Sequence, residues 1–109
     1  MGRRTSSPRT ARWDRETALA EVSRNGRALG KTEAKEFRSD REVVLAAVRQ
    51  NGAALREASE DLWSDREIVM TAVTNNGLAL SWASKELKLD DEIVIRAVTD
   101  APEAFGYVA

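Results

Sequence analysis

The chain repeats one segment at a fixed spacing, and this period constrains its fold more than any other feature of the sequence. Asp-Arg-Glu-Val-Val at residues 40–44 returns as Asp-Arg-Glu-Ile-Val at 65–69 and as Asp-Asp-Glu-Ile-Val at 90–94, with a spacing of 25 residues each time. A weaker copy begins at Asp14, 26 residues before the first of these. A period of this length is typical of stacked repeat proteins, in which each unit buries its apolar face only against its neighbours.

We therefore predict an all-α fold, an α-solenoid of helix-turn-helix repeats with three full units and an incomplete fourth. The expected units span residues 14–39, 40–64, 65–89 and 90–109, which form one helical-repeat domain with Trp13 at its start. A chain of 109 residues has room for a single domain whose modest core is shared along the stack.

Each unit is predicted to begin with a helix that is capped by a serine or by an aspartate. Ser-Asp at residues 39–40 and 64–65 precedes Arg-Glu and an apolar run. Either the serine forms a capping box with the glutamate, or the aspartate accepts the first unpaired amides of the helix. In the last unit Leu89 replaces the serine, so that Asp90 must act alone.

The end of each first helix is marked by glycine or proline. Asn-Gly pairs follow the first three helices, at Gly26, Gly52 and Gly77, whereas Ala-Pro ending at Pro102 follows the fourth. Glycine just after a helix is the preferred residue for a left-handed cap, which we expect here. The pattern Ala-Leu-x-x-Ala-Ser-x-x-Leu at residues 54–62 and 79–87 then predicts a second helix with one buried stripe.

The composition argues against catalysis and metal binding. The chain has no cysteine and no histidine, so it lacks a thiolate nucleophile, a Cys-ligated zinc and the commonest general base. The acid clusters at residues 60–65 and 90–92 lie at expected helix starts, where carboxylates favour the helix dipole, and they lack the loop spacing of a calcium site. We expect no enzyme, no catalytic residue, no metal and no cofactor.

Residues 1–12 are predicted to form a flexible basic arm, because they contain no acid and four arginines: Arg3, Arg4, Arg9 and Arg12. Three other readings stay open. The Arg/Ser/Thr-rich start resembles an organelle targeting remnant, which would place the protein in an organelle interior instead of the cytoplasm. Gly2 and Ser6 fit a loose myristoylation pattern. The arginines could also clamp an acidic partner or a phosphate backbone.

The longest apolar run, residues 43–48, is far too short to span a bilayer.

From residue 14 onward the units resemble the helical-repeat family known as domain of unknown function 4116 (DUF4116). The shared pattern is Asp-x-Glu-x-Val-x-x-Ala-Val, followed by Gly-x-x-Leu-x-x-Ala-Ser-x-x-Leu. The match is good in the two central units and weaker in the first, which has an insertion and Glu21, and in the last, which has Pro102 in place of glycine. The resemblance implies a helical array used as a module and supplies no enzymatic activity.

Residues that break the repeat are the candidates for binding. Trp13, Trp63 and Trp82 each stand where at least one well-matched unit has a polar residue, so we expect solvent to reach them. Exposed tryptophan is enriched in protein interfaces, although the three rings could instead cap the array or cover grooves between helices. Phe105 stands at the position of Leu55 in an incomplete unit, which predicts an uncovered apolar surface.

These features predict a protein–protein interaction module or a small structural subunit of a larger complex. The expected contact residues are Trp13, Trp63, Trp82, Phe105, Arg3, Arg4, Arg9 and Arg12. The alternative is an adaptor that its basic arm anchors to a membrane surface or to nucleic acid. Residues 14–109 carry 13 basic and 18 acidic side chains, which argues against nucleic acid binding by the helical body.

Overall fold

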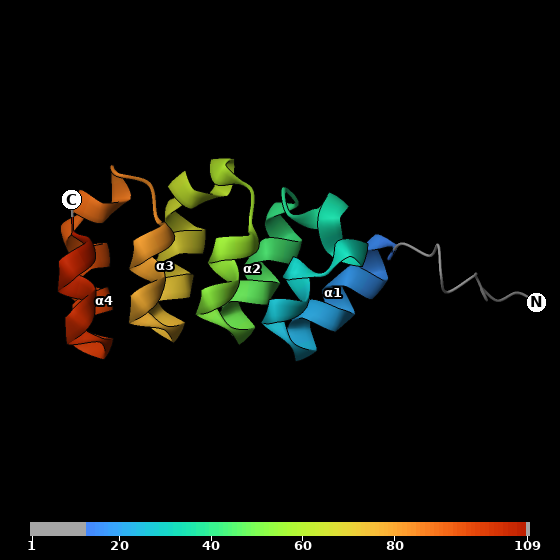
Figure 1. Ribbon diagram of the computed structural model, residues 1–109, viewed down its shortest axis with the longest axis horizontal. Helices are drawn as coiled ribbons and strands as arrows, with labels where there is room; N and C mark the ends of the chain where they lie inside the picture. The colour runs from blue at the N-terminus through green and yellow to red at the C-terminus, as the bar shows by residue number, and fades with distance from the viewer. Residues whose placement is uncertain (1–12, 109) are drawn as a thin grey trace, which may run out of the picture.

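A computed structural model describes residues 13–108. The arginines of the N-terminal arm lie outside the described residues, so the predictions that concern them remain predictions. Four α-helices lie side by side in chain order (Figure 1). They are α1 (Arg15–Arg24), α2 (Arg41–Gln50), α3 (Arg66–Asn75) and α4 (Asp91–Asp100).

Short 3₁₀-helices follow every α-helix and form a second row. They are η1 (Gly26–Gly30), η2 (Thr32–Phe37), η3 (Gly52–Glu57), η4 (Glu60–Ser64), η5 (Gly77–Trp82), η6 (Leu87–Leu89) and η7 (Pro102–Tyr107). Each α-helix packs on the α-helix of the next unit, and η1, η3, η5 and η7 pack on one another in the same order. Residues 13–108 contain no strand. The all-α repeat array is therefore confirmed.

The second half of each unit differs from the single helix that the sequence predicts. In the second unit the backbone leaves the helical region at Ala58, with φ −74° and ψ 157°. The next residue, Ser59, donates both its N–H and its hydroxyl to the carbonyl of Arg38 in the preceding unit, each at 2.9 Å. Ser84 N–H donates to the Trp63 carbonyl at 2.9 Å in the same way. The repeated Ala-Ser step thus breaks the helix because it links neighbouring units.

Aspartate, and not serine, caps the α-helices. One carboxylate oxygen of Asp40 accepts from the N–H groups of Glu42 and Val43, at 3.1 and 3.3 Å. The equivalent bonds occur at Asp65 and, as predicted, at Asp90. The Ser39 hydroxyl lies 2.7 Å from the Ser59 hydroxyl. The capping-box alternative is therefore wrong for the second unit.

The expected left-handed glycine caps are also wrong. No described glycine has a positive φ. The glycines instead let successive units approach closely, because a Cβ on Gly52 would lie 2.3 Å from the carbonyl oxygen of Ala72 in the next α-helix. The equivalent distances are 2.4 Å for Gly26 and 2.2 Å for Gly77. At each of these positions the units touch through the backbone itself.

The same glycines donate a hydrogen bond to the next unit. Their N–H groups bind the side chain of the residue that ends the following α-helix: Gly26 to Gln50 at 2.6 Å, Gly52 to Asn75 at 2.6 Å and Gly77 to Asp100 at 2.9 Å. A backbone donor that the close approach removes from water is thereby satisfied. We call this repeated contact the glycine junction.

The core between the two rows is apolar throughout. Among the described residues no polar or charged side chain is buried. The largest fully buried side chains are Leu29, Leu55, Ile68, Leu80, Ile93, Val22, Val43, Val44, Val48, Val69 and Val73. They come from all four units, so the core is continuous along the array and each unit depends on its neighbours.

The glycine junction predicts the effect of one added methyl group. Gly52→Ala should lower the free energy of unfolding by about 1–3 kcal/mol, because the new Cβ forces the second and third units apart. The control is Gly106→Ala, whose Cβ would meet nothing within 4 Å and should leave stability nearly unchanged. Urea unfolding followed by circular dichroism measures both variants. Equal stability of the two variants would contradict the close approach at Gly52.

Candidate interaction surfaces

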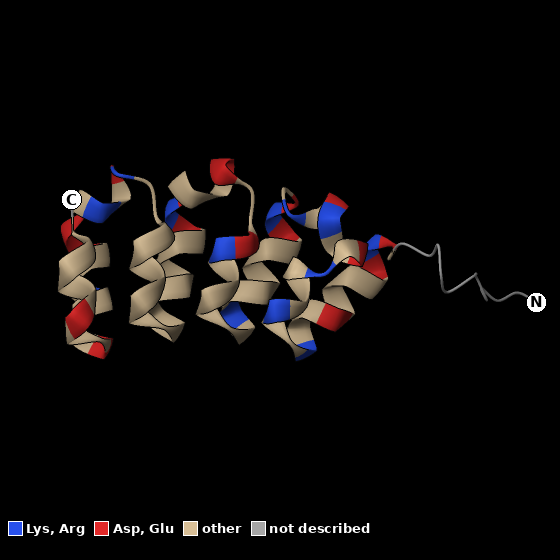
Figure 2. Cartoon of the chain, viewed as in Figure 1, with Lys and Arg blue, Asp and Glu red and all other residues tan. Residues whose placement is uncertain are grey.

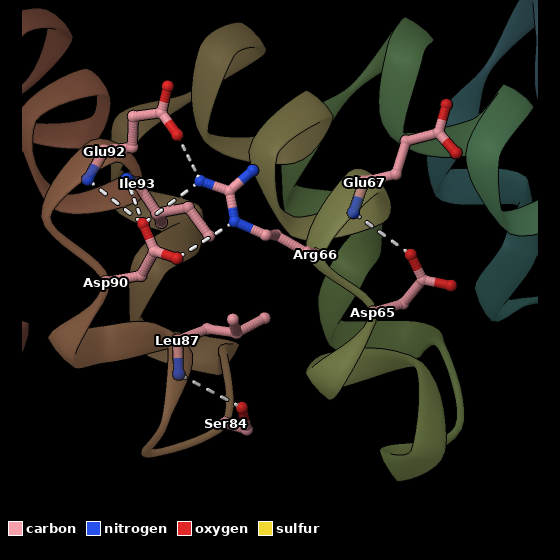
Figure 3. Close-up of polar contacts among 8 residues, drawn as sticks. All are labelled: Asp65, Arg66, Glu67, Ser84, Leu87, Asp90, Glu92 and Ile93. Atoms are coloured by element: carbon pink, nitrogen blue, oxygen red, sulfur yellow. Dashed lines mark hydrogen bonds and ion pairs between the residues drawn. The ribbon is translucent and has the colours of Figure 1, made fainter.

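An arginine at the start of each α-helix binds the start of the next one. The Arg41 guanidinium contacts the Asp65 carboxylate through two bonds, at 2.6 and 3.1 Å, and Glu67 at 2.5 Å. Arg66 makes the same contacts with Asp90, at 3.0 and 3.2 Å, and with Glu92 at 2.5 Å (Figure 3). In the first unit the equivalent arginine binds Asp40 and Glu42. We call this series the arginine ladder.

The ladder shifts the acid–base equilibria of its members. The hydrogen bond from the Arg15 guanidinium is the main cause that lowers the pKa of Asp40. Arg41 and Arg66 lower the pKa values of Asp65 and Asp90 in the same way. The amide hydrogen bonds of the N-cap lower these pKa values further, because they too favour the ionised carboxylate. At neutral pH each aspartate therefore joins two units as a charged acceptor.

The three tryptophans are half-buried and pack against the core. Trp63 donates its indole N–H to the Leu55 carbonyl at 2.9 Å, so part of its role is to close its own unit. Trp82 lines a hollow of about 110 Å³ together with residues of η1 and η3. The ammonium of Lys31 lies 6.0 Å from the ring centre of Trp13. The structure does not bring the three rings together in one site, and their role in binding stays a prediction.

The last unit exposes side chains at positions that are less exposed in the interior units. Ile95 is 62% exposed, whereas its equivalents are 8% exposed at Leu45 and half-buried at Met70. Phe105 is 69% exposed, whereas Leu55 and Leu80 at the same position are fully buried. The prediction of an uncovered apolar surface at Phe105 is therefore confirmed.

This surface faces the direction in which the array would continue. At two of its positions the interior residues, such as Arg41 and Gly52, contact the next unit. We call it the end face and define it by Asp91, Ile95, Val98, Pro102 and Phe105. Val98 is half-buried, although the two valines at its position in the interior units are fully buried.

Further hollows lie along the α-helices. A hollow of about 470 Å³ between α2 and α3 is lined by Arg49, Met70, Thr71, Thr74 and Asn75. One of about 320 Å³ lies on α4 and is lined by Glu92, Ile95, Arg96 and Thr99, so it adjoins the end face. Residues 13–108 contain no group of three acidic side chains that could hold a metal ion. No helix in that range is long and apolar enough to cross a membrane.

Charge is distributed unevenly along the array. Residues 68–84 carry no charged side chain, and the corresponding part of the cartoon is tan throughout (Figure 2). Residues 90–108 carry five acids and one base: Asp90, Asp91, Glu92, Asp100 and Glu103 against Arg96. The end face therefore belongs to the most acidic unit of the chain.

The arginine ladder and the glycine junction were not predicted, although both leave a signal in the sequence. Arginine follows the capping aspartate in the first three units, which a cap alone does not require. Gln50, Asn75 and Asp100 always place a hydrogen-bond acceptor one residue before the Asn-Gly or Ala-Pro pair. A polar residue that recurs with the repeat period is a candidate for contact between units.

A family model described as "Domain of unknown function (DUF4116)" matches residues 14–63 and 65–109. No curated protein and no solved structure matches the chain.

The arginine ladder predicts that stability falls in acid. Because Asp40, Asp65 and Asp90 have pKa values below the ordinary 3.8, their stabilising effect is complete above that value and is lost as the pH falls through the lowered pKa values. The melting temperature should therefore drop between pH 5 and pH 2.

A triple variant tests whether these three aspartates cause the loss of stability in acid. Asp40→Asn/Asp65→Asn/Asp90→Asn keeps side chains that can cap the helices but removes the charges. Its melting temperature at pH 7 should be lower, and its fall between pH 5 and pH 2 should be smaller, than in the wild type. The control Asp61→Asn removes an exposed acid of η4 and should keep the wild-type acid response. An unchanged acid response in the triple variant would show that other groups control it.

Proposed function

The chain belongs to the DUF4116 family, whose description assigns no function, and we propose that it is a non-enzymatic protein–protein interaction module or a small structural subunit of a larger complex. The end face is the observation that carries this proposal. Phe105 is mostly exposed at a position that is fully buried in the second and third units, and Ile95 is more exposed than Leu45 and Met70 at its own position. Contiguous exposed apolar side chains of this kind are typical of interaction sites.

The architecture favours binding by a preformed surface. Glycine junctions, N-capping aspartates and the arginine ladder hold successive units at several points each. A partner that docks on such an array has little backbone to order, so a smaller entropic cost opposes association.

The tryptophans and the basic arm are secondary elements of the proposal. Trp82 borders a hollow formed by three successive units, which a partner side chain could enter. The arginines of residues 1–12 would act as a tether that depends on ionic strength, since exposed charges are screened by salt.

Isolation of the tagged full chain from its native source tests this function. Mass spectrometry with stoichiometry should identify a partner set at a constant ratio. Ile95→Asp and Phe105→Asp should lose this set, because each places a charge in the apolar contact. The matched control is Leu78→Asp, which makes the same kind of change at a side chain of η5 that is 37% exposed and lies outside the end face. Circular dichroism should show all three variants folded.

Two outcomes would contradict the proposal. Recovery of the wild type alone, as a monomer, would exclude a stable partner. Partners that persist in both end-face variants but dissociate with added salt would favour the alternative, in which the basic arm anchors the protein to a membrane surface or to nucleic acid.

A further inference from the structure

The end face carries substitutions at the residues that would bind a following unit. In the interior of the array each unit offers its successor an arginine, a glycine N–H and the space beside a glycine Cα. The fourth unit offers none of these three. Asp91 stands at the arginine position and Pro102 stands at the glycine position.

Asp91 places a negative charge at the position where the interior units have the arginine of the ladder. In the interior, Arg41 faces an aspartate and a glutamate of the next helix start. A fifth unit with the same Asp-x-Glu start would place these two carboxylates opposite Asp91. Like charges at this spacing repel, so the contact that joins interior units would here oppose stacking.

Pro102 blocks the close approach. It has no N–H to donate to the side chain that would end the following helix. It also has the Cβ that interior glycines lack, and at Gly77 a Cβ would lie 2.2 Å from the carbonyl of the next helix. A fifth unit would therefore have to stand away from Pro102 and lose its packing on the apolar core.

The first unit of a second copy of this chain would not stack on the end face either. At the ladder positions it has Asp14 and Glu16, which are again acidic. Glu21 occupies the position of Ala47, Ala72 and Ala97, and it is partly exposed and paired with Arg24 at 2.8 Å. Head-to-tail stacking would bring acid onto Asp91 and place the charged residue Glu21 beside Pro102, because interior glycines at that position approach the equivalent alanine of the next unit.

The charges of the last unit indicate which kind of partner complements the end face. Asp90 and Glu92 are already paired with Arg66, and Asp100 accepts from Gly77. Asp91 is exposed and replaces a residue of opposite charge. It shares one side of α4 with Ile95 and Val98, which follow it by four and seven residues. An apolar stripe with an acid at one end complements an amphipathic helix with a basic residue beside its own apolar stripe.

We propose that the end face docks a helix of a partner protein that presents lysine or arginine to Asp91, and that Asp91 and Pro102 exclude a further unit of this array. The proposal rests on the interaction function proposed above and names the chemistry of the partner. The hollow of about 320 Å³ on α4 that Ile95 lines adjoins this surface.

The exclusion is tested by lengthening the chain. Residues 85–89 and a further copy of residues 65–89 are appended after Ala109, in the wild type and in an Asp91→Arg/Pro102→Gly background. In the double variant the added unit should stack, raise the melting temperature by several degrees and resist proteolysis, because stability grows with each stacked unit. In the wild type the added unit should stay sensitive to protease. Equal protection in both backgrounds would overturn the exclusion.

The partner chemistry is tested with a displayed library of helical peptides of about 20 residues that share one apolar stripe and have randomised flanks. Selection on the full-length wild-type protein should enrich lysine and arginine on one flank. Asp91→Lys should reverse this preference toward acidic flanks. The matched control, Asp61→Lys, changes net charge equally on η4 and should keep the basic preference. Ile95→Asp should weaken selected peptides at least about tenfold.

Any other result overturns the proposal, and each such result indicates a different mode of interaction. If the selected peptides show no charge preference and their binding is lost in Ile95→Asp, the end face binds partners through apolar contacts alone. Selection of peptides that ignore Ile95→Asp would move the binding site elsewhere on the array. Dimers of the wild type that Ile95→Asp dissolves would identify a second copy as the occupant. If no peptide is enriched, the docking helix is excluded, and co-purification of partners then decides the proposed function separately.

Discussion

Neighbouring units in this array touch through their backbones, and most other features of the fold depend on that contact. The Cα of Gly52 lies so near the Ala72 carbonyl that a side chain has no space between them. This approach brings α2 and α3 close enough for small and β-branched side chains of the two helices to pack against each other in the core. It also desolvates the glycine N–H, and the Asn75 side chain then supplies the acceptor that water no longer provides.

The arginine ladder adds direction to this stacking. Arginine at the start of one helix binds acids at the start of the next, so each of the two interior units has a donor side and an acceptor side. Exposed ion pairs contribute little free energy singly, but this guanidinium contacts two carboxylates at once and orients the aspartate that caps the helix. Because each arginine binds the unit that follows it, one substitution at the arginine position, such as Asp91, is enough to end the arginine ladder.

The sequence determined much of the fold through its period. The spacing predicts the number and order of units, and the aspartate at each helix start predicts the cap at Asp90. The interpretation of glycine was wrong because a left-handed cap and a close backbone approach both require glycine. Only the position of the neighbouring helix distinguishes the two. The break at Ala58 was missed for a related reason, since the Arg38 carbonyl that binds Ser59 lies 21 residues away.

The candidate site was only partly predictable. The position of Phe105 in an incomplete unit predicted its exposure, and the structure agrees. The tryptophans show the limit of such reasoning, because a break in a repeat reveals that a residue differs but not which way it points. Trp63 packs back onto its own unit, where its N–H satisfies the Leu55 carbonyl. The end face could not be predicted from the sequence, because the contacts that the equivalents of Asp91 and Pro102 make depend on the position of the following helix.

Hydrogen exchange of the glycine amides tests the central claim, that the glycine junctions hold the units together and that their loss at Pro102 defines the end face. The amides of Gly26, Gly52 and Gly77 should be protected, because each is donated to a side chain of the next unit. Replacing Asn75 by alanine should then release the Gly52 amide far more than that of Gly26. If all three amides exchanged at the rate of an unstructured glycine in the wild type, the junctions would not exist as described.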